Sequence, residues 1–127
     1  HLTEYRAEQV EIIRQIHDQL TDHLEQRFSI ESLSKQYLMN PTTLKQLFKA
    51  VYGTSIAAHI REHRLAYAAR EHRMKYAAQL LQSSDLSIAD IAQKVGYDSQ
   101  SRFSSVFKEQ YHMRPKEYRR NRSSESI

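Results

Sequence analysis

Residues 87–107 read SIADIAQKVGYDSQSRFSSVF, and their pattern decides the fold. Ser87 is a favoured helix N-cap residue, and Asp90 three positions later fits a capping box. Gly96 suits the left-handed position that closes a helix, after which Asp98 or Ser99 caps the next one. The apolar residues recur at helical spacing and are expected to be buried: Ile88, Ile91, Ala92, Val95, Phe103, Val106 and Phe107. Two short helices joined by a tight turn form a candidate helix-turn-helix.

A second, weaker copy of this unit lies nearer the N-terminus. Ser29 fits the N-cap of a short helix that ends near Leu38, and Asn40 followed by Pro41 fits the start of the next helix. Gly53 is expected to end that helix. Its expected buried face is Leu44, Leu47, Phe48 and Val51. Because the two units share the spacing of their apolar positions, they are two diverged copies of one module.

The remaining segments are also predicted to be helical. Residues 3–26 carry apolar side chains at steps of three and four, which favours one packing helix. Residues 55–82 contain no glycine or proline and predict a linker helix ~40 Å long. Pro115 is expected to open a last helix that ends at Arg120. We therefore expect an all-α fold: helix-turn-helix subdomains in residues 1–54 and 83–120, a linker helix at 55–82, and a frayed tail at 121–127.

Composition narrows the class of protein. Two glycines and two prolines among 127 residues argue against an all-β fold, which needs many tight turns. Without cysteine the chain has no disulfide framework and no cysteine nucleophile, and we expect it in the reducing cytoplasm. No apolar run approaches the ~20 residues of a membrane helix, so no membrane partner is expected. The chain begins at His1 and not at methionine, so we expect it to be part of a longer protein.

Four stretches of the C-terminal half have a characteristic sequence. Residues 85–92 read DLSIADIA, 95–103 read VGYDSQSRF, 107–108 read FK and 115–119 read PKEYR. Together they resemble the signature of the AraC/XylS family of bacterial transcription regulators, and with the weaker first unit the resemblance covers residues 5–120. It implies sequence-specific binding of double-stranded DNA, with the second helix of each unit in a major groove.

This resemblance assigns DNA contacts to the exposed faces of two helices. Glutamine can pair bidentately with adenine and arginine with guanine, whereas serine and threonine adapt to either base. The residues expected to contact base edges are Thr42, Lys45, Gln46, Gln100, Ser101, Arg102 and Ser105. Phosphate contacts position a protein without specifying sequence, and they are expected from Ser29, Thr43, Lys49, Ser87, Ser104 and Lys108.

The linker holds a tandem duplication. Residues 61–69 read REHRLAYAA and residues 70–78 read REHRMKYAA, so seven of nine positions match, whereas the family's usual linker has one copy. Nine extra helical residues add ~13.5 Å and ~900° of rotation, a net half-turn. With a continuous helix, we expect one chain to engage a duplex with one unit at a time, or two chains to exchange halves as a homodimer. A break between Ala68 and Arg73 is the alternative.

The same duplication doubles a histidine, as His63 and His72. His59 and His63 lie four residues apart on one helical face, as a pair of metal ligands would. No carboxylate or cysteine joins them at ligand spacing, so we expect no metal and no other cofactor. The expected surface is exposed and basic, with Tyr67 and Tyr76 packed at its edge.

Two other classes of function compete with DNA reading. One is a helical protein-interaction module that dimerises, or docks on RNA polymerase, without base-specific readout. A steep salt dependence of DNA binding separates the two, because phosphate contacts release counterions. The other is an enzyme, which we do not expect, because the sequence has no glycine-rich phosphate loop and no supported Ser-His-acid arrangement. DNA-repair methyltransferases that carry a similar domain transfer methyl groups to cysteine, which this chain lacks.

Overall fold

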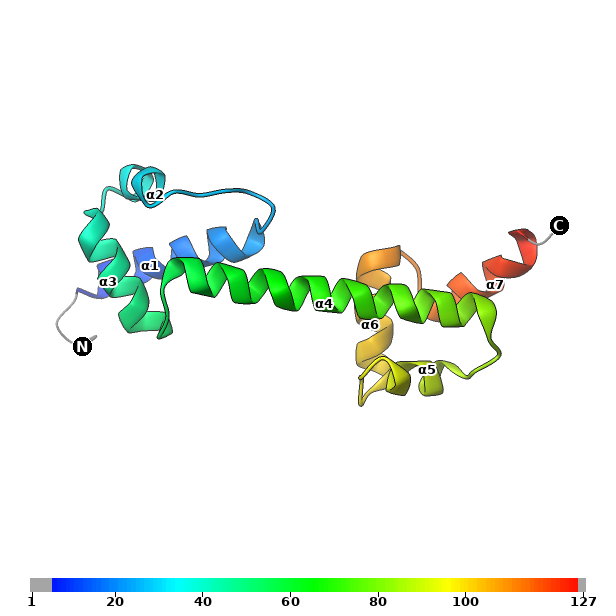
Figure 1. Cartoon of the computed structure of the whole chain (residues 1–127). Coiled ribbons are helices and arrows are strands. Elements are labelled where there is room, and N and C mark those ends of the chain that lie inside the picture. Colours follow the sequence, from blue (N-terminus) through cyan, green and yellow to red (C-terminus); the bar gives the residue numbers. More distant parts are fainter. Residues whose placement is uncertain (1–5, 126–127) are drawn as a thin grey trace. The chain divides into compact units, whose positions relative to one another are not determined.

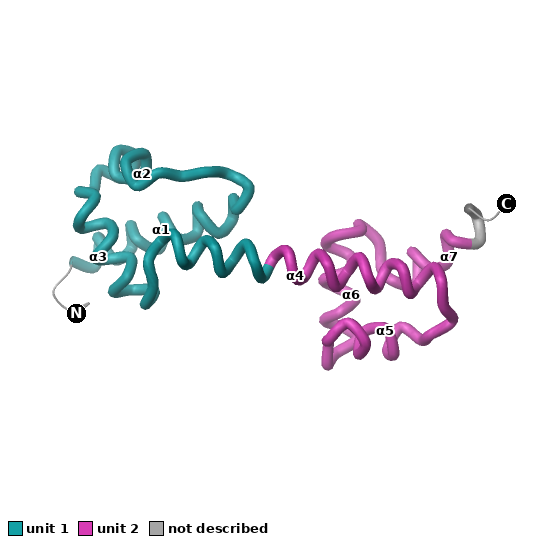
Figure 2. Tube along the Cα trace, viewed as in Figure 1, with its two compact units in different colours: residues 1–66 teal, residues 67–127 magenta. Residues whose placement is uncertain are grey.

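The computed structural model describes residues 6–125, with side chains up to Arg122. All regular structure in these residues is α-helical, as predicted (Figure 1). The helices are α1 (Ala7–Asp22), α2 (Ile30–Tyr37), α3 (Pro41–Tyr52), α4 (Ile56–Ser83), α5 (Ile88–Lys94), α6 (Gln100–Tyr111) and α7 (Pro115–Glu125). The chain divides into two compact units, residues 1–66 and 67–127, with the boundary inside α4 (Figure 2). None of the described helices is both long and apolar enough to cross a membrane.

The first unit buries one apolar face of each of its helices. Its core consists of Ile13, Ile16, Leu20, Leu33, Met39, Leu44, Leu47, Phe48 and Ile56. The first helix is shorter than the predicted range of residues 3–26, because α1 ends at Asp22. Beyond it, Arg64 of α4 donates to the carbonyl oxygens of Leu24 at 2.9 Å and Gln26 at 3.0 Å, which holds this segment as a turn. Residues 3–5 lie outside the described part of the chain.

Side-chain caps fix the helix ends of the first unit. The Ser29 hydroxyl accepts the Ser32 N–H at 3.0 Å, and the Ser32 hydroxyl accepts the Ser29 N–H at 3.3 Å, so a capping box opens α2. The Asn40 side chain accepts the Thr42 N–H at 2.8 Å and opens α3. Gly53 closes α3 at φ 78°, as predicted.

The turn between α2 and α3 contains a residue in the left-handed region. Leu38 has φ 53°, a conformation that costs an L-residue about 1–2 kcal/mol, and its side chain is 93% exposed. The backbone N–H groups of Leu38 and Met39 both donate to the Ser34 carbonyl oxygen, and the Ser34 hydroxyl donates to the Met39 carbonyl. These bonds fix the conformation of the turn, and this conformation determines where α3 begins.

The second unit repeats this construction. Its core consists of Met74, Ala77, Ala78, Leu81, Ile91, Ala92, Val95, Phe103, Val106 and Phe107. The Ser87 hydroxyl accepts the Asp90 N–H at 3.0 Å, which is the serine half of the predicted capping box. Gly96 has φ 90°, and the Ser99 hydroxyl accepts the Arg102 N–H at 3.2 Å to open α6. Of the two predicted caps for that helix, Ser99 is therefore the one used.

The last helix is longer than predicted. We expected it to end at Arg120 and residues 121–127 to be frayed, but α7 continues to Glu125. The physical reason is Arg122, whose guanidinium donates to the carbonyl oxygens of Leu81 and Ser84, both at 2.9 Å. Residues 126–127 lie outside the described part of the chain.

α4 is one unbroken helix of 28 residues, so the alternative of a break between residues 68 and 73 is wrong. The two copies of the duplicated segment serve different units. Leu65 in the first copy is 65% exposed, whereas its counterpart Met74 is fully buried in the second unit. Arg64 bonds carbonyl groups of the first unit, whereas its counterpart Arg73 lies over the Tyr97 ring, 5.8 Å from the centroid. Each unit therefore uses one copy for its own packing.

Candidate nucleic-acid interface

α3 presents a polar face to solvent in the first unit. Its residues Leu44, Leu47 and Phe48 are fully buried. At about 100° per residue, the opposite face of the helix is formed by four side chains, all exposed: Thr42, Lys45, Gln46 and Lys49. Thr43 lies at the flank and is half-buried. The three side chains predicted to contact bases thus share one face, with Lys49 further along the helix.

α6 presents a similar face in the second unit. Phe103, Val106 and Phe107 are buried. The side chains that lie opposite them are exposed and comprise Ser101, Ser105 and Lys108. Arg102 and Gln100 are exposed at the two sides of this face, and Ser104 is half-buried at its flank. Of the predicted base contacts in α6, Gln100 lies furthest from the centre of the face.

The two faces correspond position by position. Aligning Leu44 with Phe103 brings Gln46 onto Ser105 and Lys49 onto Lys108. The same alignment pairs the exposed Lys45 with the half-buried Ser104, so the units differ at this position. Each unit therefore has short or amide-bearing side chains at the centre of the face and a lysine further along the helix.

The N-cap serines of α2 and α5 are exposed at the start of the supporting helices. Ser29 and Ser87 each accept one backbone N–H through the hydroxyl oxygen. A hydroxyl that accepts a hydrogen bond retains its own hydrogen to donate. Capping therefore leaves both serines able to contact a phosphate.

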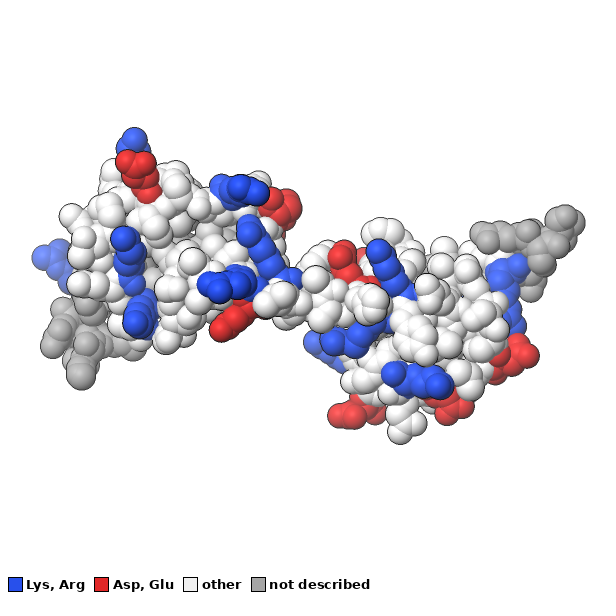
Figure 3. Space-filling model, in the orientation of Figure 1, with Lys and Arg blue, Asp and Glu red and all other residues white. Residues whose placement is uncertain are grey.

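Basic side chains at these faces carry charge that is not neutralised by near neighbours. Lys45, Lys49, Arg102 and Lys108 are exposed, and within the described residues none of the four forms an ion pair. On the side of the molecule drawn in Figure 3, lysine and arginine side chains lie on both units, interspersed with aspartate and glutamate. Such charges attract the phosphate backbone without reading sequence.

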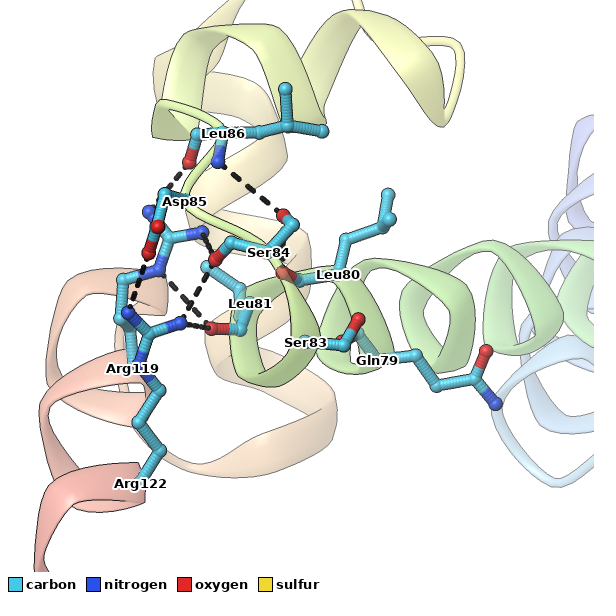
Figure 4. Close-up of polar contacts among 9 residues, drawn as sticks. All are labelled: Gln79, Leu80, Leu81, Ser83, Ser84, Asp85, Leu86, Arg119 and Arg122. Carbon is cyan, nitrogen blue, oxygen red and sulfur yellow. Dashed lines mark hydrogen bonds and ion pairs between the residues drawn. The ribbon is translucent and has the colours of Figure 1, made fainter.

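Two arginines whose roles the sequence pattern did not reveal fix the end of α4 (Figure 4). Arg119 donates to the carbonyl oxygens of Leu81 and Ser84, both at 3.1 Å, and to that of Leu86. Arg122 donates to the first two of these carbonyls and to the Asp85 carboxylate at 3.0 Å. We call Arg119 and Arg122 the arginine clamp.

The clamp positions α5. The last carbonyl groups of a helix have no partner within the helix, and guanidinium groups satisfy them well. Because the clamp binds the end of α4 and the loop up to Leu86, it holds the loop that leads into the Ser87 N-cap. The available sequence signal was arginine in the family-like stretch 115–119, but nothing in that pattern shows which carbonyls it binds.

The histidines of α4 differ from their predicted setting. We expected His59 and His63 on an exposed basic surface, but both are half-buried and lie close to His17 of α1. Packing of α4 against the first unit covers this side of the helix, which the α4 sequence alone did not reveal. Tyr67 and Tyr76, expected to pack at the edge, are 47% and 43% exposed.

Two capped pairs of short helices, each with an exposed polar second helix, define a protein of the helix-turn-helix class. A family profile described as a helix-turn-helix domain matches residues 68–121. The chain is 30% identical to the regulatory protein SoxS of Escherichia coli (strain K12) over 108 residues, which are 85% of this chain and 92% of SoxS. The chain belongs to the AraC family of helix-turn-helix transcriptional regulators, as the sequence resemblance predicted.

Other relatives are longer proteins. The chain is 38% identical to the transcriptional regulator AlkR of Acinetobacter baylyi over 95 residues, and these residues are 75% of this chain. It spans 28% of the length of AlkR and 33% of the length of the regulator ExsA of Pseudomonas aeruginosa. Among solved structures, it is similar to the C-terminal domain of AraT, a response regulator from Geobacillus stearothermophilus, at 32% identity and a TM-score of 0.39, covering 87% of this chain and 84% of that one.

Proposed function

We propose that this chain binds double-stranded DNA in a sequence-specific manner and regulates transcription, with α3 and α6 as its two recognition helices. The observation that carries the proposal is the matched pair of exposed polar faces, each lying opposite a buried apolar face of the same helix. A major groove about 12 Å wide admits one helix, and its base edges offer a distinct pattern of donors and acceptors. Membership of a family of transcriptional regulators supports the same function.

Base contacts are proposed for the centres and sides of the two faces. Arg102 has the donor geometry to bind guanine bidentately, and Gln46 and Gln100 have the amides to bind adenine. Thr42, Lys45, Ser101 and Ser105 complete the proposed base-contacting set. Phosphate contacts are proposed for Ser29, Thr43, Lys49, Ser87, Ser104 and Lys108. We propose binding without catalysis as the mode of action, and the cytoplasm, which contains the DNA of bacteria, as the location of the protein.

The salt dependence of DNA binding tests this function against a protein-interaction module that does not read bases. If lysine and arginine side chains neutralise phosphates, log K falls linearly with log salt concentration, by about 0.9 per phosphate contact. Lys108→Ala is expected to lower that slope by about one without changing the preferred sequence. A flat salt dependence would favour the interaction module. RNA polymerase as a further partner stays a prediction.

The duplicated linker determines how a single chain can engage DNA. Because α4 runs unbroken through both copies, the nine extra residues add ~13.5 Å and a net half-turn to a one-copy linker. This supports the proposal that a chain engages a duplex with one unit at a time, or that two chains exchange halves as a homodimer.

Deleting residues 65–73 tests this proposal. It removes Arg73, which lies over the Tyr97 ring, and brings Arg64 next to Met74 in its place. The deletion keeps Arg64, which bonds the first unit, and Met74, which lies in the core of the second. It removes the exposed Leu65 and restores a one-copy linker. We expect the deletion variant to bind, as a monomer, two half-sites about 10 base pairs apart more tightly than the parent chain. Equal affinity and the same oligomeric state for the two proteins would contradict the proposal.

A further inference from the structure

Three histidine side chains converge inside the first unit. His17 comes from α1, and His59 and His63 lie one turn apart on α4. One ring nitrogen of each lies within 4.8 Å of the corresponding nitrogens of the other two. The ring centroids are 4.8 Å apart for His17 and His59 and 4.5 Å apart for His59 and His63. All three are half-buried, so the cluster has apolar support and remains in contact with solvent.

The hydrogen bonding of these rings leaves nitrogens available to a ligand. The Nδ1 atom of His17 lies 3.0 Å from the Asp18 carboxylate, and a histidine held in this way by a carboxylate presents its Nε2 lone pair outward. The Nε2 atom of His59 is buried and has no hydrogen-bond partner among the described residues. Buried polar atoms are normally satisfied, so an unpartnered one in a group of imidazoles calls for a ligand.

The cluster also favours the neutral form of His59. Burial holds the pKa of His59 below its ordinary value, and the neighbouring His63 and His17 lower that pKa further, against a smaller opposing effect of Glu62. The α3 groups that contact His59 are the uncharged rings of Phe48 and Tyr52, and the Asp18 carboxylate faces His17. Neutral imidazole is the form that coordinates metal ions.

We propose that His17, His59 and His63 form a site for a divalent transition-metal ion of the class that prefers imidazole, with Zn²⁺ as its representative. Three protein nitrogens and one open position filled by water is a known arrangement for such ions. Tetrahedral bonds of about 2.05 Å place the ligand nitrogens ~3.3 Å apart, so the rings close inward by side-chain rotation when the ion binds. The carboxylate of Asp18 orients the first ligand.

The site lies directly behind α3. The His17 ring stacks on Tyr52 at 4.2 Å between centroids, and His59 meets the Phe48 ring edge-on at 5.6 Å. An ion bound here ties α1 to α4 across the base of α3, so its binding energy stabilises the first unit. The histidines and their packing are the same whether or not α3 contacts DNA.

The duplication supplies a matched control for testing the site. His63 and His72 occupy the same position of identical Arg-Glu-His-Arg segments, but His72 is exposed and lies outside the cluster. We expect isothermal titration of the unaltered chain with Zn²⁺ alone to reveal one tight site. His63→Gln is expected to weaken Zn²⁺ binding by about tenfold or more, because loss even of a group that only orients a ligand has an effect of this size. His72→Gln is expected to leave Zn²⁺ binding unchanged.

Equal Zn²⁺ affinity for the two variants, or no tight site in the unaltered chain, would overturn the proposal. Circular dichroism of both variants without metal checks that helicity is preserved. Should His63→Gln lose helicity, side-chain NMR of the unaltered chain provides the second measurement. The imidazole signals of His17, His59 and His63 are then expected to shift together on addition of Zn²⁺, and a shift confined to the other histidines would refute the site.

Discussion

Replacing Arg119 with alanine should loosen the second unit and leave the first unchanged. The guanidinium of Arg119 makes three hydrogen bonds to carbonyl groups at the end of α4 and in the loop that follows. Hydrogen bonds from a charged group contribute ~1.5–3 kcal/mol each when buried, and we take about 1 kcal/mol each because this side chain is half-buried and Arg122 shares two of the carbonyls. The expected loss is therefore about 3 kcal/mol.

Amide hydrogen exchange of the native protein measures this loss in each unit separately. A loss of about 3 kcal/mol corresponds to ~100-fold faster exchange through opening of the second unit, because each 1.4 kcal/mol is a factor of ten. Amides of the buried face of α6, such as Phe103 and Val106, report on the second unit, and those of Leu44 and Leu47 serve as the internal reference.

Arg120→Ala is the matched control, because Arg120 is adjacent in sequence and exposed. This substitution is expected to change the free energy of opening, measured by amide exchange, by less than about 0.5 kcal/mol, as surface substitutions usually do. Arg119→Lys keeps the charge but loses the forked donors, so it should recover little of the stability. If Arg119→Ala and Arg120→Ala exchange alike, the clamp contributes nothing to the second unit and the reasoning is refuted.

Three further outcomes are expected. Leu38→Gly should stabilise the first unit by about 1 kcal/mol in urea unfolding, since glycine adopts the left-handed conformation without strain; a loss of stability would show that the conformation is not strained. The first unit should lose stability as pH falls below 6.5, because the pKa of His59 is lowered in the folded state and the unfolded chain therefore binds the proton at a higher pH. In chemical unfolding, His59→Leu should reduce this dependence of stability on pH. Arg102→Ala should relax base preference in binding-site selection, at a cost of ~1–3 kcal/mol for the preferred duplex, whereas Lys108→Ala should weaken all duplexes alike; equal effects would contradict the assigned roles.

Local signals made most of the fold predictable. Ser29, Asn40, Ser87 and Ser99 cap helices where the sequence indicates, because a cap depends only on residues within one turn. The buried faces were also predictable, since the spacing of apolar residues directly reflects the helical repeat. Helix ends that depend on groups distant in the sequence could not be predicted. α1 stops early where Arg64 binds its following turn, and α7 runs on where the clamp holds it.

The candidate sites were predictable to different degrees. The polar faces of α3 and α6 followed from helical spacing once their buried sides were assigned, although Gln100 proved peripheral and Thr43 and Ser104 half-buried. The histidine cluster could be foreseen only in part. The spacing of His59 and His63 suggested a pair, but His17 is contributed by a different helix and joins them only through packing of α1 with α4. Nothing in the local sequence indicates that contact.

The most direct test of DNA reading is selection of bound duplexes from a random pool, comparing the parent chain with a variant in which six face residues are alanine. Those residues are Thr42, Lys45, Gln46, Gln100, Ser101 and Arg102. All six are exposed, so the variant should keep its helicity. We predict that the parent enriches a defined sequence and that the variant does not. Enrichment of the same sequence by both proteins would show that α3 and α6 do not read DNA.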